Sequence, residues 1–364
     1  MMDDISTTRD AFGDGRFGGE RVVRVLELYC GIGGIACALK RLSRATTVCD
    51  AIDVNPHAIE TYGMNNDGTR PRGVNLESAK AKALEGANAD AWCASPPCQP
   101  FTRAGLKRDV GDQRCASLLR LIDVMRTMRN RPKYVFVENV VGFETSRARE
   151  KLLEALREMD FYAQEFILTP TMFGVPYSRP RYFLCARSTR AFEDGVDGLR
   201  RSPPARALSR AREWIPNYDE SADAELVVAP LARFLDADDE CLWRENAVAQ
   251  ADVDRAIGSL DIVNSSDHTC NCFTKSYSQY VKGTGSVISN VRVDKKTWNG
   301  VMGQGEDDVR LRYFTVDEVA RLHSFPSDFK WPSTLTKRQQ YTLLGNSMSV
   351  ACVAPLLDYL FADD

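Results

Sequence analysis

The residues best suited to chemistry follow the apolar run Ala89–Ala94, which predicts a β-strand. The next nine residues read SPPCQPFTR, so three prolines restrict the backbone around one thiol, Cys98. The polar neighbours Gln99, Thr102 and Arg103 favour an exposed thiol in a positive environment, where a thiolate forms more readily. A lone Cys is otherwise a small buried hydrophobe, which is how we interpret most of the 11 Cys. Cys98 is therefore the candidate nucleophile.

Two further segments place charged groups at strand ends. Glu138 follows the strand predicted at Tyr134–Val137, and it is either a satisfied structural acid or a group that transfers a proton. Arg179 and Arg181 flank a proline next to the strand predicted at Tyr182–Ala186. Two such arginines are either a surface charge pair or the holders of a planar polar substrate.

A glycine turn and a later acid predict a nucleotide-binding element. The strand predicted at Val22–Leu28 runs into Gly31, Gly33 and Gly34, and Asp53 lies 22 residues after the first glycine. That spacing suits an acid that bonds ribose hydroxyls. The pattern is not the dinucleotide G-x-G-x-x-G, so S-adenosylmethionine is favoured over NAD; the alternative is a tight strand-to-helix turn without a ligand.

Strands and helical patterns alternate around these residues, which predicts an α/β fold with a mostly parallel sheet covered on both faces. Glycines among charges predict a flexible tail at 1–20. We expect a catalytic domain at 21–187 plus 341–364 and a smaller inserted domain at 188–340. Thr315 and Glu318 predict a capping box at the start of a helix.

Composition excludes some classes of protein. The 364 residues hold 47 Lys plus Arg and 50 Asp plus Glu, a formal net charge of −3, which excludes a binder held on nucleic acid by bulk positive charge. Positive charge is local, with nine basic and three acidic residues from Cys98 to Lys133, either an RNA-binding patch or a solvated helix face. The scattered Cys and three His favour reduced thiols, no disulfide framework and no metal site. Without a signal peptide or a run of ~18 apolar residues, we expect a cytoplasmic or nuclear protein without a membrane span.

Taken together, the motifs resemble the cytosine-5 methyltransferase family from Val22 to Leu360. Six segments carry the resemblance in family order: ELYCGIGG from Glu27, AIDVN from Ala51, SPPCQPF from Ser95, ENV from Glu138, RPR from Arg179 and LGNS from Leu344. The resemblance implies a Rossmann-like S-adenosylmethionine-dependent methyltransferase fold with a smaller inserted target-recognition domain.

The resemblance also implies a role for each matching residue. Cys98 would add to carbon 6 of cytosine, Glu138 would bond ring N3 and the exocyclic amine, Arg181 would bond O2, and Arg179 would assist in positioning. The implied cofactor contacts are Leu28, Gly31, Ile32, Gly33, Gly34, Asp53, Val54, Asn75, Leu76, Ser95, Pro97, Asn346 and Ser347. The implied substrate contacts are Gln99, Thr102, Arg103, Asn139, Cys272, Phe273, Thr274 and Lys275.

Within the family, Cys272-Phe273-Thr274 looks like the Cys-Phe-Thr signature of the tRNA-aspartate methyltransferases, also called DNA methyltransferase homologue 2. That group methylates cytosine 38 of the anticodon loop, so the resemblance implies tRNA, and tRNA-Asp in particular, as the substrate. A loop cytosine is already partly unstacked, which lowers the cost of extruding it. The alternatives are a DNA cytosine-5 methyltransferase with the same active site and a catalytically silent nucleic-acid-binding protein. We take the chain as a monomer.

Overall fold

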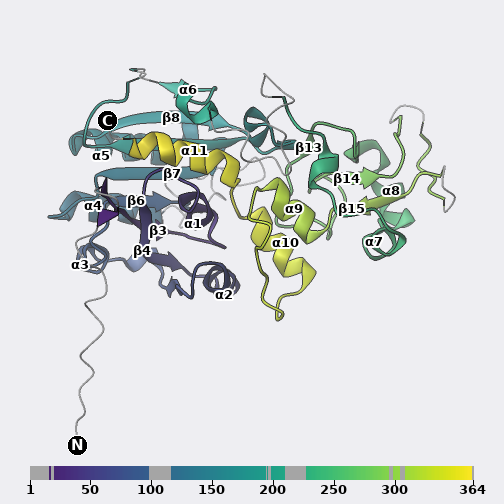
Figure 1. The fold of residues 1–364 in the computed structure, drawn as a ribbon, viewed down its shortest axis with the longest axis horizontal. Helices are drawn as coiled ribbons and strands as arrows, with labels where there is room; N and C mark the ends of the chain where they lie inside the picture. Colours follow the sequence, from purple (N-terminus) through teal and green to yellow (C-terminus); the bar gives the residue numbers. More distant parts are fainter. Residues whose placement is uncertain are drawn as a thin grey trace, which may run out of the picture.

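A twisted eight-stranded sheet forms the centre of the computed structural model, which describes residues 16–17, 20–97, 116–193, 195, 198–209, 227–294, 298–303 and 308–362. Its strands are β3 (Val23–Leu28), β4 (Thr46–Asp53), β5 (Arg72–Gly73), β6 (Ala91–Ala94), β7 (Tyr134–Val140), β8 (Tyr162–Leu168), β10 (Arg181–Arg187) and β11 (Leu199–Arg200). The spatial order is β11-β8-β10-β7-β6-β3-β4-β5. Every pair from β7 to β5 is parallel, while β10 runs antiparallel to both of its neighbours. The predicted mixed, mostly parallel sheet is confirmed (Figure 1).

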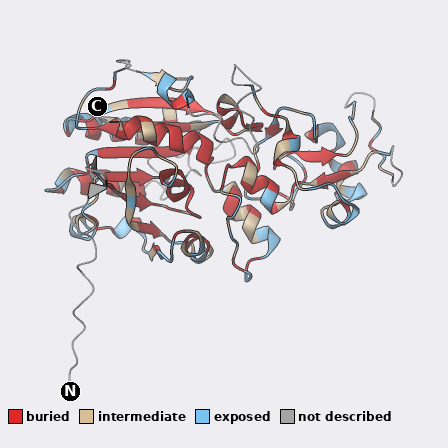
Figure 2. Ribbon diagram, viewed as in Figure 1, coloured by how far each residue is buried: buried red, intermediate tan, exposed pale blue. Residues whose placement is uncertain are grey.

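Helices cover both faces of this sheet. They are α1 (Gly34–Leu39), α2 (Pro56–Asn65), α3 (Ala81–Glu85), α4 (Ala116–Thr127), α5 (Arg147–Glu158) and α11 (Val350–Phe361). Because successive side chains of a strand point to opposite faces, β3 and β6 contribute to two hydrophobic layers. Val25 and Cys93 pack in one layer with α1 and α11, and Leu26 and Trp92 pack in the other with α4 and α5. Figure 2 shows the buried strands between these layers.

The chain between β11 and α11 builds a second lobe, on the right of Figure 1. Its strands β12 (Ile262–Asn264), β14 (Val287–Ser289) and β15 (Leu311–Tyr313) form a small sheet. Its helices are α7 (Glu240–Glu245) and α8 (Gln250–Ala256), while α9 (Val316–Leu322) and α10 (Lys337–Gly345) lie between this lobe and the main sheet. The short helix α6 (Ala205–Leu208) belongs to the main lobe, where it packs on α11. A separate parallel pair, β9 (Tyr177–Ser178) and β13 (Cys270–Asn271), ties this lobe to the edge of the main sheet. Single 3-10 turns lie at Leu76–Ser78, Phe143–Thr145, Pro170–Phe173, Leu231–Phe234 and Ile257–Ser259.

The two lobes share a core. Val253 and Leu311 pack in a small cluster of the second lobe, whereas Phe234 and Phe314 belong to the large cluster that also contains α1 and α11. The domain boundary predicted after residue 340 falls inside α10.

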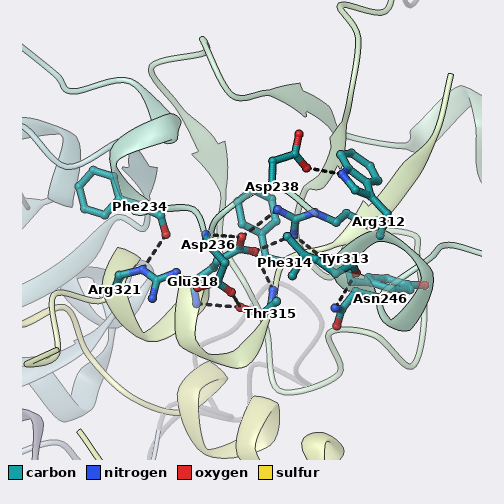
Figure 3. A network of polar contacts seen from close by, with 12 residues as sticks. Phe234, Asp236, Asp238, Asn246, Arg312, Tyr313, Phe314, Thr315, Glu318 and Arg321 are labelled. Atoms are coloured by element: carbon teal, nitrogen blue, oxygen red, sulfur yellow. Dashed lines mark hydrogen bonds and ion pairs between the residues drawn. The ribbon is translucent and has the colours of Figure 1, made fainter. Parts of the chain in front are cut away.

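A polar network reinforces the junction between the lobes (Figure 3). Arg312 of β15 makes two 2.8 Å hydrogen bonds to Glu318 of α9, and both side chains are buried. Glu318 also accepts from the Thr315 N–H at 2.8 Å, which confirms the predicted capping box. Asp236 bonds Thr315 and Arg321, so the second lobe is held to α9 through several partners.

Two further expectations from the sequence concern the N-terminal segment and the absence of a membrane span. Of the segment 1–20, predicted as a flexible tail, the structure describes residues 16–17 and 20, where β1 (Arg16–Phe17) pairs with β2 (Glu20–Arg21). In the described residues one helical stretch, Lys337–Phe361, is long and apolar enough to cross a membrane by length and composition alone. Most of its apolar part is buried inside the protein, where α11 covers the sheet.

Candidate active site

The glycine turn lies at the carboxyl edge of the sheet, between β3 and α1. Tyr29, Gly31 and Gly33 all have positive φ, at 58°, 53° and 91°. Glycine adopts a positive φ without strain, which explains why positions 31 and 33 of the turn are glycines. A Cβ at Gly31 would meet no atom of the described residues within 4 Å, which leaves room for a ligand beside the backbone there.

Asp53 fixes this turn from the end of the neighbouring strand β4. Its Oδ2 accepts the Gly31 N–H at 2.8 Å, and its Oδ1 accepts the Asn55 N–H at 2.8 Å. Each carboxylate oxygen keeps a second lone pair for another donor such as a hydroxyl. Val54 follows with its side chain 65% exposed, available to pack against a flat ligand.

The other residues predicted to bind the cofactor divide by exposure. Leu28, Ile32 and Leu76 are buried in the core, so only their backbone is positioned to meet a ligand. Asn75 is exposed, and its side chain accepts the Glu77 N–H at 3.0 Å, which begins a 3-10 turn. Gly34 is buried with α1. Of the remaining four residues, Pro97 and Asn346 are exposed, and Ser95 and Ser347 are half-buried.

Glu138 lies on β7 beside the end of β6. Its carboxylate is largely buried, accepts from Ser95 Oγ at 2.5 Å, and lies 3.5 Å from Arg181 Nε. The parallel register of β6 and β7 brings residues 43 positions apart into this contact. A carboxylate and a guanidinium thus stand side by side, as recognition of a polar planar ring requires.

Asn139 was expected to bind substrate, and the structure gives its side chain two partners within the protein. Its side chain is 1% exposed because successive residues of β7 face opposite sides of the sheet. Its Nδ2 donates to Pro96 O at 3.4 Å, and its Oδ1 accepts the Val140 N–H at 2.8 Å. Asn139 therefore anchors Pro96, at the start of the proline-rich loop, through its backbone carbonyl.

Arg179 and Arg181 have different environments although they are two residues apart. Arg181 is partly accessible and faces Glu138, whereas Arg179 is 2% exposed. Arg179 donates to Tyr177 Oη at 3.3 Å and to three backbone carbonyls: Phe273 at 3.2 Å, Gly345 at 3.0 Å, and Ser347. These contacts join β9, the 272–275 segment and the turn between α10 and α11.

Cys272 lies between these two arginines. Its Sγ is 3.1 Å from Arg179 Nη1 and 3.9 Å from Arg181 Nη2. Burial opposes ionisation of the thiol, but the charges and hydrogen bonds of both arginines outweigh it and lower the pKa of Cys272. The pairing of β13 with β9 produces this contact, since it sets Cys270 beside Tyr177.

The other predicted substrate contacts of this segment differ in exposure. The Phe273 side chain lies in the core: it is 1% exposed and packs against Tyr177, Tyr277 and Phe314. Thr274 is half-buried, and Lys275 is exposed. The exposed Lys275 side chain is accessible to a phosphate, whereas the buried Phe273 ring anchors the 272–275 segment to the core.

Cys98, Gln99, Thr102 and Arg103 lie outside the described residues, as does the basic stretch that follows them up to residue 115. The structure describes the strand that precedes them and Ser95–Pro97. Their roles stay predictions from the sequence. Among the described residues, no group of three or more His, Cys, Asp or Glu side chains could hold a metal ion.

Two supporting residues escaped the sequence analysis. Tyr177 Oη lies 3.2 Å from His323 Nε2, and His323 Nδ1 lies 2.8 Å from Val319 O. Burial, followed by the charge of Arg179, moves the pKa of His323 well below its usual value. The neutral ring therefore donates to Val319 and accepts from Tyr177, which holds Tyr177 in place for Arg179. The only sequence signal was that His323 is one of three His in the chain.

A mostly parallel sheet with a glycine turn after its first long strand, an acid after the next strand and polar groups at the same edge defines a Rossmann-like nucleotide-binding fold. The family model described as C-5 cytosine-specific DNA methylase matches residues 23–361. The chain therefore belongs to the C-5 cytosine-specific DNA methylase family, whose members depend on S-adenosylmethionine.

Relatives within the family extend over most of the chain. The tRNA (cytosine(38)-C(5))-methyltransferase of Schizosaccharomyces pombe is 33% identical over 93% of this chain and 96% of its own length. The DNA (cytosine-5)-methyltransferase of Dictyostelium discoideum is also 33% identical, over 93% of this chain and 94% of its own. The crystal structure of the S. pombe Dnmt2 methyltransferase superimposes with a TM-score of 0.77 at 30% identity, covering 93% of this chain and 98% of that one.

Proposed function

We propose that this protein is a tRNA (cytosine-38-C5)-methyltransferase that transfers a methyl group from S-adenosylmethionine to carbon 5 of a cytosine in the anticodon loop of tRNA-Asp. The observation that carries this proposal is the similarity over nearly the full chain to a relative whose name states that activity. The Cys272-Phe273-Thr274 segment supports it, because it adjoins the guanidinium groups at the site.

The geometry of the cofactor turn fits S-adenosylmethionine. The open backbone at Gly31, the carboxylate of Asp53 and the exposed Val54 lie together at the edge of the sheet. In the proposal Asp53 accepts the ribose hydroxyls and Val54 packs on the adenine, while the bound cofactor supplies the methyl group. A glycine turn without a pyrophosphate-binding pattern suits a ligand with a single nucleoside.

The chain's own residues prepare the cytosine. The Cys98 thiolate adds to carbon 6 of the ring, which makes carbon 5 nucleophilic toward the methyl group. Once methylated, carbon 5 loses its proton to a base, the double bond between carbons 5 and 6 forms again, and the Cys98 thiolate is released. Glu138 bonds N3 and the exocyclic amine, held for this by Ser95 Oγ. Arg181 neutralises charge that develops at O2, and its position follows from the contact with Glu138.

A methyl-transfer assay with tRNA-Asp and duplex DNA side by side tests the proposal. We expect bisulfite sequencing to find methylation at cytosine 38 of the tRNA. Cys98→Ala should abolish it, whereas Cys241→Ala, which removes an exposed thiol of the second lobe, should leave it unchanged. Labelling of DNA without labelling of tRNA would overturn the choice of substrate and favour the alternative, a DNA cytosine-5 methyltransferase, which the name of the D. discoideum relative supports.

We further propose that the protein acts in the cytoplasm or the nucleus, where tRNA is available and thiols such as Cys98 stay reduced. Imaging of the tagged full chain in its own cells tests this. Accumulation in a secretory compartment would overturn it.

A further inference from the structure

A buried carboxylate lies beneath the glycine turn and takes no part in the proposed chemistry. Glu27 is the second-last residue of β3, and its side chain is 0% exposed. Tyr62 Oη donates to its Oε1 at 2.7 Å, and its Oε2 is buried without a hydrogen-bond partner among the described residues. The strand is paired on both sides at this residue, with Ala51 and Cys93, so its backbone is fixed.

Tyr62 connects this carboxylate to the turn. A Cβ at Gly33 would lie 3.2 Å from Tyr62 Cδ2 and 2.8 Å from Asn66 Nδ2, so both side chains pack directly against Gly33. Asn66 Nδ2 also donates to Tyr62 O at 3.0 Å. The hydrogen bond to Glu27 therefore holds the Tyr62 ring in the position in which it packs against Gly33.

The other side of the turn is anchored separately. Asp53 holds the Gly31 N–H, while Gly33 begins α1 with no side chain that could cap the helix. The Ala36 N–H, in the first turn of α1, interacts favourably with the Glu27 carboxylate. Glu27 thus supports, through the Tyr62 ring, the Gly33 end of the turn, which Asp53 does not reach.

We propose that Glu27 is a positioning residue for the cofactor, which holds the 29–33 turn through Tyr62 in the conformation that binds S-adenosylmethionine. This inference rests on the proposed function, because it assigns a role toward the same cofactor. The ionised carboxylate is the stronger acceptor for the Tyr62 hydroxyl, so ionisation tightens the support of the turn. Cofactor affinity therefore rises with the ionisation of Glu27.

The surroundings of Glu27 place this change near neutral pH. Burial raises the pKa of Glu27 to about 7, against the opposing effects of Tyr62, Ala36 and Lys40. The titratable or charged groups that face it are Tyr62, Cys30, Cys37, Cys93 and Lys40. Burial raises the pKa of the tyrosine and of the three thiols, so these four groups stay neutral while Glu27 titrates.

The test is the dissociation constant of S-adenosylmethionine, measured by calorimetry on the full chain from pH 5.5 to 8.5. For the wild type we expect affinity to rise with pH through 7. Glu27→Gln and Tyr62→Phe should weaken binding on the order of tenfold at pH 8, the loss of about one charge-assisted hydrogen bond, and should flatten the pH profile. If Glu27→Gln does not fold, Tyr62→Phe carries the same prediction.

Glu165→Gln is the matched control. Glu165 is also a buried carboxylate of the main sheet that accepts a tyrosine hydroxyl, from Tyr182 at 2.6 Å, but it lies on β8 and packs with Arg149. It should lose stability and keep the wild-type affinity and pH profile. Wild-type affinity and pH dependence in both Glu27→Gln and Tyr62→Phe would overturn the inference and leave the proposed function intact. Absence of binding by the wild type would instead overturn the proposed function, and the inference with it.

Discussion

Gly345 illustrates how strongly a single residue constrains this active site. A Cβ at Gly345 would lie 2.2 Å from the backbone N of Lys275 and 2.4 Å from the backbone C of Thr274. Both atoms belong to the main chain, so neither can rotate away. The glycine lets α10 approach the 272–275 segment, and this approach places the Gly345 carbonyl within reach of Arg179.

We expect Gly345→Ala to destabilise the protein by about 3 kcal/mol or to separate α10 from this segment, and to lower methyl transfer with it. Urea unfolding followed by circular dichroism measures the first effect. Gly63→Ala in α2 is the control, because its Cβ would meet only ordinary contacts at 3.7 Å. That substitution should be neutral or stabilising. Equal stability of Gly345→Ala and the wild type would contradict the steric argument.

Two buried groups should give opposite pH dependence of the free energy of unfolding. The pKa of His323 is lowered by burial, so its contribution is present above the unfolded pKa of about 6.5 and is lost as pH falls. The pKa of Glu27 is raised from 4.5 to about 7, so its contribution is present below 4.5 and is lost as pH rises to 7. Between pH 5 and 6.5 the two contributions oppose each other in the wild type.

We therefore expect Glu27→Gln to gain stability as pH rises from 5 to 6.5, and His323→Gln to lose it, each by up to about 1.4 kcal/mol per pH unit relative to the wild type. Denaturant unfolding at several pH values measures this. Parallel profiles for the two variants would refute the assignment of these titrations.

At the scale of elements, the pair formed by Arg312 on β15 and Glu318 on α9 is a buried polar link between the small sheet of the second lobe and α9. Both side chains are almost fully buried, and Glu318 also caps α9. Removing one partner leaves the other as an uncompensated buried charge.

Arg312→Met should therefore cost about 3–5 kcal/mol of unfolding free energy. Arg126→Ala breaks an exposed pair with Glu158 and should cost less than about 1 kcal/mol. Thermal denaturation of both variants against the wild type compares the two costs. A similar small loss in both would mean that the buried pair does not anchor α9.

Features that depend on neighbouring residues could be predicted from the sequence, whereas features that depend on pairing between distant segments could not. The glycine turn after β3 and the capping box at Thr315 were predictable because each depends on residues close in the chain. The burial of Phe273 and Asn139 was not, because it depends on strand pairing between segments far apart in sequence. The same holds for Arg179, whose partners come from residues 93 to 168 positions away. Motif spacing identified this arginine as important, but only the fold separates it from Arg181.

At the scale of the whole molecule, the shared core predicts cooperative unfolding. Phe234 and Phe314 of the second lobe pack in the same hydrophobic cluster as α1 and α11. We expect one calorimetric transition for the full chain, with equal van't Hoff and calorimetric enthalpies. Two separated transitions would indicate instead that the lobes are thermodynamically independent.

Helix α11 comes after every strand of the main sheet in the chain, yet it covers the sheet face on which Phe136 lies. Its end is fixed to early residues: Arg44 Nη1 donates to Phe361 O at 2.6 Å, and Ser43 Oγ donates to Asp358 at 3.0 Å. A nascent chain in which all eight strands have been synthesised therefore still exposes the part of that apolar face that α11 later covers. Until α11 emerges from the ribosome, that face is a binding surface for chaperones and a starting point for aggregation.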